Sequence, residues 1–567
     1  MWQQKRRKVD EDGNSVPLPA TGPDGEQSYM RIQFSEAEIA AEERRPKRKV
    51  AVLIGYAGTG YHGLQINHKE KTIEGDIFAA FVAAKAIAKT NADDPRKSSF
   101  VRCARTDKGV HAAGNMVSLK LIIEDPDVVQ KINDNLPPQI RVWGITRTNN
   151  AFSSYQSCDS RWYEYLMPSY CLLPPHIHSF LGKKVAQYAK DNGYEGELAK
   201  RLEDVQGFWE EVEKNDIQPI MDSLEESVRE AVLAKLHAVR EGLVGDDGIT
   251  DDKAAKKKPA ETQESEPQAT EEAAPTAPTE ELTESTPATT TAPTEDAPAA
   301  AEEATTAEAA KDVKPVNPVE QALKRISAAY IAAKRRYRVT PGRLAQLQEA
   351  LDQYVGTRNY HNYTVQKSHG DPSAKRLIKS FQLNKEPVQI NDTQWLSLKV
   401  HGQSFMMHQI RKMVGMAVLV TRCGTPLGRI EESYGPTRIS IPKAPGLGLL
   451  LERPVFDSYN ARAKDMYNLE PLDFGNYEKE IQKFKEEQIY QRIFELEEQQ
   501  NSFHTFFHQV DNFKSDYFLW VTAGGLEAAQ HRPGMKGRDP AAFTGDDDEG
   551  EDDDAAAAAK GGEGNEG

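Results

Sequence analysis

The sequence predicts an α+β fold made of two halves, each of which combines strands with helices. Three observations support this prediction. A run typical of a buried strand at 49–56 precedes an apolar-periodic segment that begins near Thr72. A strand-rich order of the same kind returns after residue 160. A long stretch at 246–310 has almost no large apolar side chain and interrupts this second half. We therefore expect an internally duplicated sandwich with an insertion.

The first half reads as a small α/β sandwich. Thr72 is the expected N-cap of its first helix, and Glu74 and Asp76 lie in the first turns, where acidic side chains favour a helix start. The expected elements are a strand at 49–56, a helix from 72 to about 88, strands at 99–103 and 116–122, and a helix at 128–136.

The second half has a comparable order but is split by helices and by a linker. Its expected elements are a strand at 161–168 (RWYEYLMP), acidic-surfaced helices at 180–245, a helix at 342–354, strands at 376–383 and 394–402, a helix at 404–422, and one or two helices at 470–520.

Composition shifts divide the chain into seven parts. They are a disordered arm of mixed charge at 1–46, an N-terminal α/β domain at 47–156, a C-terminal α/β domain at 157–182 and 320–460, a helical insertion at 183–245, a disordered acidic linker at 246–319, C-terminal helices at 461–524, and a disordered acidic tail at 525–567.

The net charge of −16 is unusual for a protein that binds nucleic acid, but it is unevenly distributed. Residues 246–310 carry a net −13 and residues 546–567 a net −9, which leaves +6 for the rest of the chain. A mildly basic remainder is compatible with a polyanionic partner. We interpret the acidic stretches as solubility elements, with competition against a polyanionic partner for the basic surface as the alternative.

The cysteines and the apolar runs limit the class of protein. The four cysteines form no CxxC pair and no Cys/His cluster at zinc spacing, which indicates a reducing compartment and predicts no metal site. No apolar run reaches the length of a membrane span, and the first residues lack a signal-peptide core, so we expect no membrane association. Basic clusters at 5–8 (KRRK) and 44–49 (RRPKRK) resemble nuclear localisation signals. They predict a nuclear protein that binds import receptors, and a phosphate-touching basic arm is the compatible alternative.

The segment at 102–113, RCARTDKGVHAA, places one carboxylate, Asp107, among Arg102, Arg105, Lys108 and His111. Strand-like sequence flanks it on both sides, so Asp107 should lie on a loop that a rigid sheet holds. Nearby cations favour the charged form of a carboxylate, and an ionised carboxylate can act as a nucleophile or a base. A plain polar β-turn explains the spacing equally well.

Three glycines at 58, 60 and 63 fit the dinucleotide-binding pattern GxGxxG after a strand. In that pattern the third glycine lies within the helix that receives the pyrophosphate. Here Gly63 is followed by the polar stretch LQINHKEK, and the predicted helix begins only at Thr72. The sequence therefore disfavours a dinucleotide-dependent enzyme.

Two further segments carry candidate site residues. Tyr163, within RWYEYLMP, can stack on a base or take part in proton transfer, or it is an ordinary strand residue. In GQSFMMHQIRKMVG at 402–415, His408, Arg411 and Gly415 have the spacing of one line along a helix. The alternative for Arg411 is a solvated helix face, and that for His408 a packed or phosphate-facing ring.

Together ARTDKGVHA, GYAGTGYHGLQ, RWYEYLMP and GQSFMMHQIRKMVG resemble the motifs of the TruA-type pseudouridine synthases, and the segments at 356–364 and 441–459 also match. The resemblance covers roughly 47–182 and 320–460 and is strongest to a eukaryotic, nuclear, multisite branch that acts on tRNA. It implies two similar α/β sandwich domains that share a central mixed antiparallel sheet, with a basic cleft between them.

The resemblance also implies site roles and partners. Asp107 corresponds to the catalytic aspartate, Tyr163 to the tyrosine placed against the target base, and Arg411 to the arginine that pairs with the aspartate. The implied substrate-binding residues are Arg105, Thr106, His111, Tyr61, Gln65, His408 and Arg161. The implied reaction isomerises uridine to pseudouridine without a cofactor, and Asp107 attacks ribose C1′ or base C6 or assists glycal formation.

The implied partner is structured tRNA, with small nuclear RNA as a second substrate class, and the terminal helices favour a monomer. The alternative function is a non-catalytic tRNA-binding or tRNA-folding module. Two features depart from the family habit without touching its motifs, namely the linker and the acidic tail. The neutral stretch SSYQ at 153–156 casts doubt on one basic contact to RNA.

Overall fold

The computed structural model describes residues 34–67, 70–241 and 317–529. The basic cluster at 5–8, most of the acidic linker and most of the acidic tail lie outside these residues. By its internal contacts the chain forms two units, a large one that includes the sheet and a small one at 220–327. Within the small unit, helix α8 (Glu226–Glu241) and the first part of α9 (Pro318–Arg336) bury Val232, Leu323 and Ile326.

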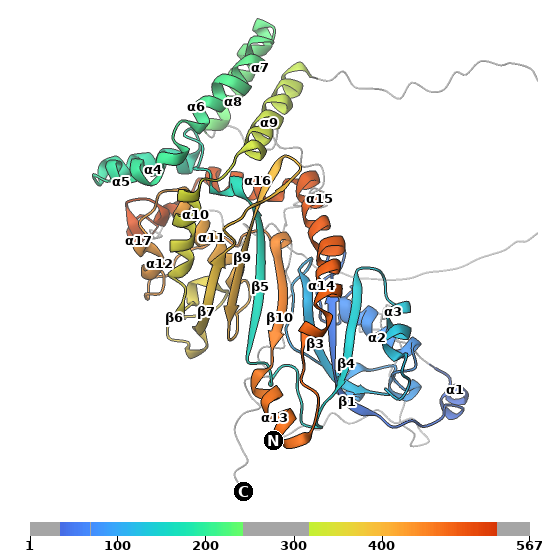
Figure 1. Cartoon of the computed structure of the whole chain (residues 1–567). Coiled ribbons are helices and arrows are strands. Elements are labelled where there is room, and N and C mark those ends of the chain that lie inside the picture. The colour runs from blue at the N-terminus through green and yellow to red at the C-terminus, as the bar shows by residue number, and fades with distance from the viewer. Residues whose placement is uncertain (1–33, 68–69, 242–316, 530–567) are drawn as a thin grey trace, which may run out of the picture. The chain divides into compact units, whose positions relative to one another are not determined.

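The large unit is built on one mixed sheet, which confirms the predicted α+β class (Figure 1). Its main path runs β4-β1-β3-β10-β5-β9-β7-β6, while β2 pairs with β3 and β8 with β9. The strands are β1 (Arg48–Tyr56), β2 (Val101–Arg102), β3 (His111–Leu121), β4 (Ile140–Arg147), β5 (Ser160–Pro168), β6 (Gly356–Asn359), β7 (Lys375–Leu383), β8 (Val388–Ile390), β9 (Thr393–Gly402) and β10 (Leu449–Val455).

Strand β10 joins the two halves of the sheet. It pairs antiparallel with β5 and parallel with β3, where Leu450 faces His111 and Leu451 faces Ala112. All other strand pairs described are antiparallel. The sequence did not predict β10 as a strand, although its run LLL is apolar. The sheet is therefore completed by residues far along the chain.

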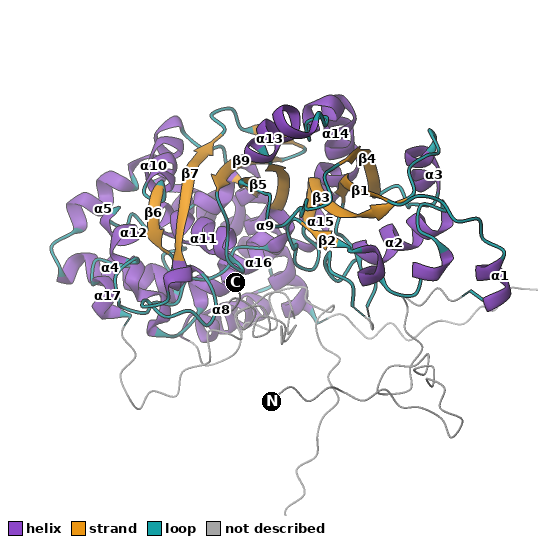
Figure 2. Ribbon diagram, turned by 90° about the horizontal axis from the view of Figure 1, so that it is seen from below, coloured by secondary structure: helices purple, strands orange, loops and turns teal. Residues whose placement is uncertain are grey.

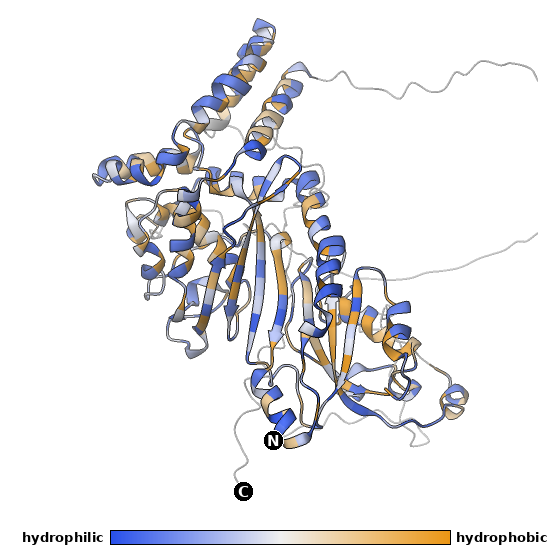
Figure 3. Ribbon diagram, in the orientation of Figure 1, coloured by the Kyte–Doolittle hydropathy of each residue, from blue (hydrophilic) through white to orange (hydrophobic). Residues whose placement is uncertain are grey.

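Apolar side chains on both faces of the sheet form two cores. Val52 and Ile54 of β1 belong to the larger core, whereas Ala51 and Leu53 point to a smaller one. This alternation is that of a strand buried on both sides. Helices α2 (Ile73–Ala83) and α11 (Gln409–Arg422) lie on one side of the strands and α14 (Glu478–Phe484) on the other (Figure 2). Figure 3 shows hydrophobic colour on the strands of the first half and a mostly hydrophilic α14.

The remaining helices lie mainly in the insertion and after the sheet. They are α1 (Glu36–Ala40), α3 (Val128–Asp134), α4 (Phe180–Asp191), α5 (Glu195–Arg201), α6 (Phe208–Val212), α7 (Gln218–Asp222), α10 (Pro341–Asp352), α12 (Gly428–Glu432), α13 (Asp457–Tyr467), α15 (Gln491–Gln500), α16 (Ser502–Asn512) and α17 (Gly525–Ala528). A π-helical segment, Lys485–Tyr490, links α14 to α15. Two of these helices, α1 and α17, fall inside the ranges predicted as arm and tail.

Two predicted helix boundaries were wrong, and backbone conformation explains both. Thr72 caps α2 as expected, its hydroxyl accepting from the Gly75 N–H at 3.3 Å, but the helix ends at Ala83 because Lys85 adopts a left-handed conformation with φ +56°. The helix predicted at 404–422 begins only at Gln409, because His408 has φ +59°. His408 therefore does not lie on one line of that helix with Arg411.

Within the residues that the structure describes, no helix is long and apolar enough to cross a membrane.

Candidate active site

Asp107 lies on the loop between β2 and β3, as the sequence predicted. The glycine-rich loop at 57–65 holds this loop through its backbone, because the Leu64 N–H donates to the Thr106 carbonyl at 3.1 Å and the Gly109 N–H donates to the Tyr61 carbonyl at 3.3 Å. A Cβ atom at Gly58 would stand 2.2 Å from the Val110 carbonyl oxygen. Glycine is therefore required for close contact between two loops, which gives the GxGxxG pattern a structural explanation.

Two buried polar side chains, Tyr56 of β1 and Asn115 of β3, hold the Asp107 loop through hydrogen bonds. The Tyr56 hydroxyl, which is fully buried, lies 2.9 Å from Thr106 Oγ1 and accepts from Asn115 Nδ2 at 3.1 Å. Asn115 Nδ2 also donates to the Ala104 carbonyl at 3.0 Å. The residues on either side of Arg105 are thus bonded to side chains of β1 and β3, so the sheet fixes the backbone next to Asp107.

A buried carboxylate accounts for one of the predicted cationic neighbours. Glu74 of α2 is fully buried and binds the Arg102 guanidinium at 2.5 and 2.9 Å and the Ile66 N–H at 3.0 Å. Burial raises the pKa of Glu74, while Arg102 and, more weakly, Arg105 act in the opposite direction. Arg102 is therefore engaged in joining α2 to β2 and does not serve Asp107.

The charges that act most on Asp107 come from the second half of the chain. His408 Nδ1 lies 3.3 Å from Asp107 Oδ2, a contact that becomes an ion pair when the ring is protonated, and the Asp107 side chain is 33% exposed. Burial would raise the pKa of Asp107, but the His408 ring and the charges of Arg411 and Lys443 lower it below its ordinary value. The carboxylate is thus ionised at neutral pH and still accessible.

The start of α11 positions two of these groups. His408 precedes the helix in a left-handed conformation that is uncommon for a non-glycine residue, and strain of this kind concentrates at functional sites. Arg411 is buried, and its Nε donates to the Ala444 carbonyl at 2.7 Å. A Cβ at Gly415 would stand 2.4 Å from the Pro442 carbonyl oxygen, so the segment that carries Lys443 packs directly on the helix.

Tyr163 lies on β5, buried, with its ring edge-on to Phe405 at 5.2 Å between centroids and an interplanar angle of 81°. Burial raises the pKa of the Tyr163 phenol, with further contributions from neighbours that include Asp107. The phenol is therefore neutral at physiological pH. The structure brings Tyr163, His408 and Arg411 into the electrostatic surroundings of the same carboxylate.

The other predicted site residues occupy different positions. Arg105 is exposed beside Asp107, and Gln65 is half-buried. Tyr61 is buried and donates to Asp76 Oδ2 at 2.5 Å, while the Arg161 guanidinium donates to the Cys103 carbonyl at 2.8 Å. His111 is fully buried and accepts from the Gly58 N–H at 3.2 Å, and burial lowers its pKa to about 4, so the ring is neutral. The polar groups of these three side chains, those of Tyr61, Arg161 and His111, are thus hydrogen-bonded within the protein.

Sequence reasoning missed Lys443, Phe405 and Tyr56. Lys443 lies in IPKAPGLG, within the matching segment at 441–459, and a lysine between two prolines was the available signal. Tyr56 lies within the matching motif GYAGTGYHGLQ, but its contact with Asn115 across the sheet has no local signal. Among the described residues no group of three or more His, Cys, Asp and Glu side chains is placed to hold a metal ion.

Comparison with known proteins identifies similar chains. A sequence profile described as tRNA pseudouridine synthase matches residues 350–457. A tRNA pseudouridine synthase 1 of Eremothecium gossypii is 39% identical over 541 residues, which cover 95% of this chain and 84% of the relative. The protein of that name in Schizosaccharomyces pombe is 42% identical over 86% of this chain and 88% of its own length. A tRNA pseudouridine(27/28) synthase of Saccharomyces cerevisiae is 31% identical over 81% and 98%, respectively.

Proposed function

Because the chain belongs to the TruA family of tRNA pseudouridine synthases, we propose that it isomerises uridine to pseudouridine in tRNA, with Asp107 as the nucleophile. The observation that supports this most directly is the state of Asp107. It is an ionised, partly exposed carboxylate, held on a loop that β1 and β3 fasten. A nucleophile needs both a charged carboxylate and access to the substrate, and Asp107 has both.

The reaction requires a uridine outside the base stack, since C1′ is otherwise unreachable. The N1–C1′ bond breaks, the uracil turns, C5 bonds to C1′, the C5 proton leaves and N1 gains a proton. Asp107 attacks C1′ or C6, or assists glycal formation, and all three routes need the ionised carboxylate that His408, Arg411 and Lys443 favour.

Tyr163 stacks against the target base and Arg411 orients the carboxylate. The neutral phenol of Tyr163 suits stacking and hydrogen bonding better than direct proton abstraction, because burial disfavours the phenolate. The Arg411 guanidinium is buried, and its hydrogen bond to the Ala444 carbonyl fixes its position. It therefore supplies a positive charge that solvent does not screen.

Exposed cations around the loop supply phosphate contacts. Arg105 and Lys108 flank Asp107 and are exposed, and Lys375 is exposed on β7. Neutralisation of phosphates releases counterions, so tRNA binding should weaken steeply with salt. Small nuclear RNA is the second substrate class, because phosphate contacts of this kind do not distinguish one folded RNA from another.

The proposed compartment is the nucleus, reached through import receptors. Of the cluster at 44–49, Arg48 and Lys49 belong to β1, and Lys49 is buried with its ammonium 3.4 Å from the Ser99 carbonyl oxygen. The stretch 44–47 precedes the strand and is exposed throughout. The proposed import determinant is therefore 44–47 together with 5–8.

For the oligomeric state, we propose a monomer.

The deciding experiment incubates the full-length chain and an Asp107→Ala variant with unmodified tRNA transcripts and maps pseudouridine by chemical adducts and primer extension. Pseudouridine from the wild type alone would support the reaction and the nucleophile together. Tight tRNA binding by both proteins without product from either would favour the alternative, a tRNA-binding module.

A further inference from the structure

A cavity of about 930 Å³ lies on the face of β5 opposite Tyr163. Successive strand residues point to opposite faces, and Trp162, Glu164 and Leu166 line this cavity. The register pairs Glu164 with Lys399 and Leu166 with Ser397 of β9, and both β9 residues also line the cavity. Neighbouring side chains of two strands therefore form the floor. The cavity therefore lies behind the catalytic strand and is separate from the Asp107 site.

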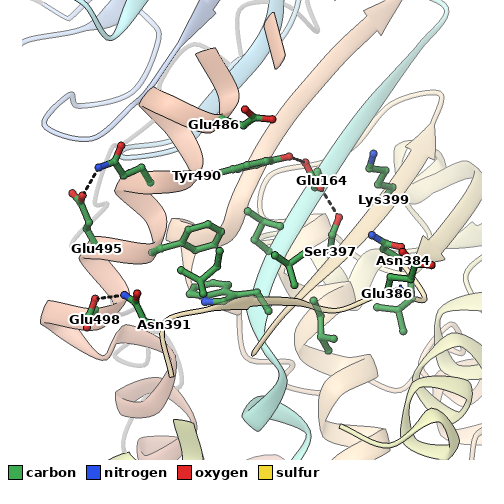
Figure 4. Close-up of a pocket in the computed structure, with 18 of the residues that line it drawn as sticks. Glu164, Asn384, Glu386, Asn391, Ser397, Lys399, Glu486, Tyr490, Glu495 and Glu498 are labelled. Carbon is green, nitrogen blue, oxygen red and sulfur yellow. Dashed lines mark hydrogen bonds between the residues drawn. The ribbon is translucent and has the colours of Figure 1, made fainter. Parts of the chain in front are cut away.

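One face of the C-terminal helical segment forms the wall. Glu486, Tyr490, Phe494 and Glu498 follow one another at intervals of four residues, which places them along one line of the helix. Glu495 also lines the groove from this helical segment, as Figure 4 shows. The floor and the wall are thus two regular elements, and the groove does not depend on a loop for its shape.

The groove combines aromatic rings with carboxylates. The rings of Trp395 and Phe494 lie 4.7 Å apart, and Val388, at 52% exposure, opens the apolar lining to solvent at the edge strand β8. An apolar groove of this size takes up side chains or a small organic molecule. Such an occupant must also suit the charges around it.

Those charges are almost entirely negative. Five lining residues are glutamates and one, Lys399, is cationic; the glutamates are Glu164, Glu386, Glu486, Glu495 and Glu498. Glu164 is already matched, since it accepts from Tyr490 at 2.6 Å and from Ser397 and lies 3.3 Å from Lys485 Nζ. The other four are exposed, and within the described residues no ion pair reaches them.

Phosphates are repelled by such a rim, while an arginine or lysine side chain gains a carboxylate partner and an aromatic face. We propose that this groove binds a cationic peptide segment of a partner protein, with an apolar side chain against the Trp395 and Phe494 rings and basic side chains toward Glu486 and Glu495. The groove gives an RNA-modifying protein a surface for protein partners that its RNA-binding face does not share.

The test measures binding of a fluorescein-labelled peptide, RLRWRLR, to the full-length chain by fluorescence anisotropy, with ELEWELE as the peptide control. The groove variant carries Glu486→Lys and Glu495→Lys. The matched variant carries Glu480→Lys and Glu487→Lys, two exposed glutamates of the same helical segment that do not line the groove. Both variants change the net charge equally, and the acidic tail is common to all proteins compared.

We expect the groove variant to bind RLRWRLR at least tenfold more weakly than the wild type, and the matched variant within twofold of it. A neutral variant, Glu486→Gln with Glu495→Gln, should give an intermediate loss and covers the case in which charge reversal prevents folding. Equal binding by wild type and groove variant, or no binding, would overturn the proposal, as would groove-dependent binding of an oligouridine. The assay involves no turnover, so its failure would leave the proposed reaction untouched.

Discussion

The two faces of β5 use carboxylates in opposite ways. On one face Asp107 is a single anion among His408, Arg411 and Lys443, and its side chain keeps a third of its surface exposed. On the other face Glu164 is buried. It accepts hydrogen bonds from the Ser397 and Tyr490 hydroxyls and forms an ion pair with Lys485. Both carboxylates are ionised, so ionisation alone does not identify the reactive group. The two carboxylates differ in accessibility, which is what the proposed role of Asp107 as a nucleophile requires.

The largest expected effect is that of Asp107→Asn. The amide keeps the shape of the side chain but removes the negative charge, so pseudouridine formation should fall at least about a thousandfold. Binding of tRNA should persist within a few-fold, because the phosphate contacts remain. Single-turnover rates and filter binding measure the two quantities, and a loss of less than about tenfold in rate would remove Asp107 from the role of nucleophile.

Glu164→Gln should have the converse effect. Lys485 retains Glu452 but loses its partner Glu164, and we expect the free energy of unfolding to fall by about 3 kcal/mol with the rate per folded molecule unchanged. The effect depends on pH. Burial opposes ionisation of Glu164, but Lys485 lowers its pKa to about 2, so the stabilisation is full above about 4.5 and is lost as the pH falls toward 2.

Denaturant unfolding at pH 7 and pH 3 checks this prediction. The difference in unfolding free energy between wild type and Glu164→Gln should shrink at pH 3. A tenfold drop in rate for the folded variant would show instead that the two faces of β5 are coupled.

Tyr56→Phe tests the fastening of the loop. The change leaves Thr106 Oγ1 and one Asn115 hydrogen without their buried partner, so we expect a loss of about 1–2 kcal/mol and a fall in rate of up to about tenfold. Tyr360→Phe is the matched control, because the buried Tyr360 hydroxyl donates to the Tyr354 carbonyl at 2.7 Å. Equal rate losses in both variants would argue against a positioning role for Tyr56.

The smallest expected effect concerns a third buried carboxylate. Burial raises the pKa of Glu497 to about 7, although it accepts from Tyr170 at 2.7 Å. A raised pKa contributes stability that is full below about 4.5 and is lost as the pH rises through 7. Glu497→Gln should therefore gain about 1 kcal/mol over the wild type at pH 8 but not at pH 4.5. Unfolding midpoints at the two pH values measure it, and a pH-independent difference would contradict it.

Much of the sheet was predictable because its signals are local. The strands β1, β5, β7 and β9 and the N-cap at Thr72 follow from apolar runs and from side chains near a helix start. The loop position of Asp107 followed from the strands on either side. The left-handed conformations of Lys85 and His408, which set two helix boundaries, have no such signal, because neither residue is a glycine.

The surroundings of Asp107 were not predictable from neighbouring residues. The sequence suggested Arg102 as a cationic neighbour of Asp107, but Arg102 forms an ion pair with the buried Glu74 instead. The strongest electrostatic partners stand some 300 residues later, at 408, 411 and 443, and only the resemblance connected Arg411 with the loop. The groove was equally hidden, since its floor and wall come from separate parts of the chain.

The position of β10 has a consequence for synthesis of the protein. Strand β3 ends at Leu121, but the strand that joins it to β5 ends only at Val455. At about 10 residues per second, the ribosome needs roughly half a minute between the two. During that interval the part of the β3 edge that will receive β10, at His111 and Ala112, stays unpaired. The upstream strands β2 and β1 can already pair with the rest of that edge and with the opposite edge. The nascent chain must wait for its last strand before Asp107 and Tyr163 can share a site.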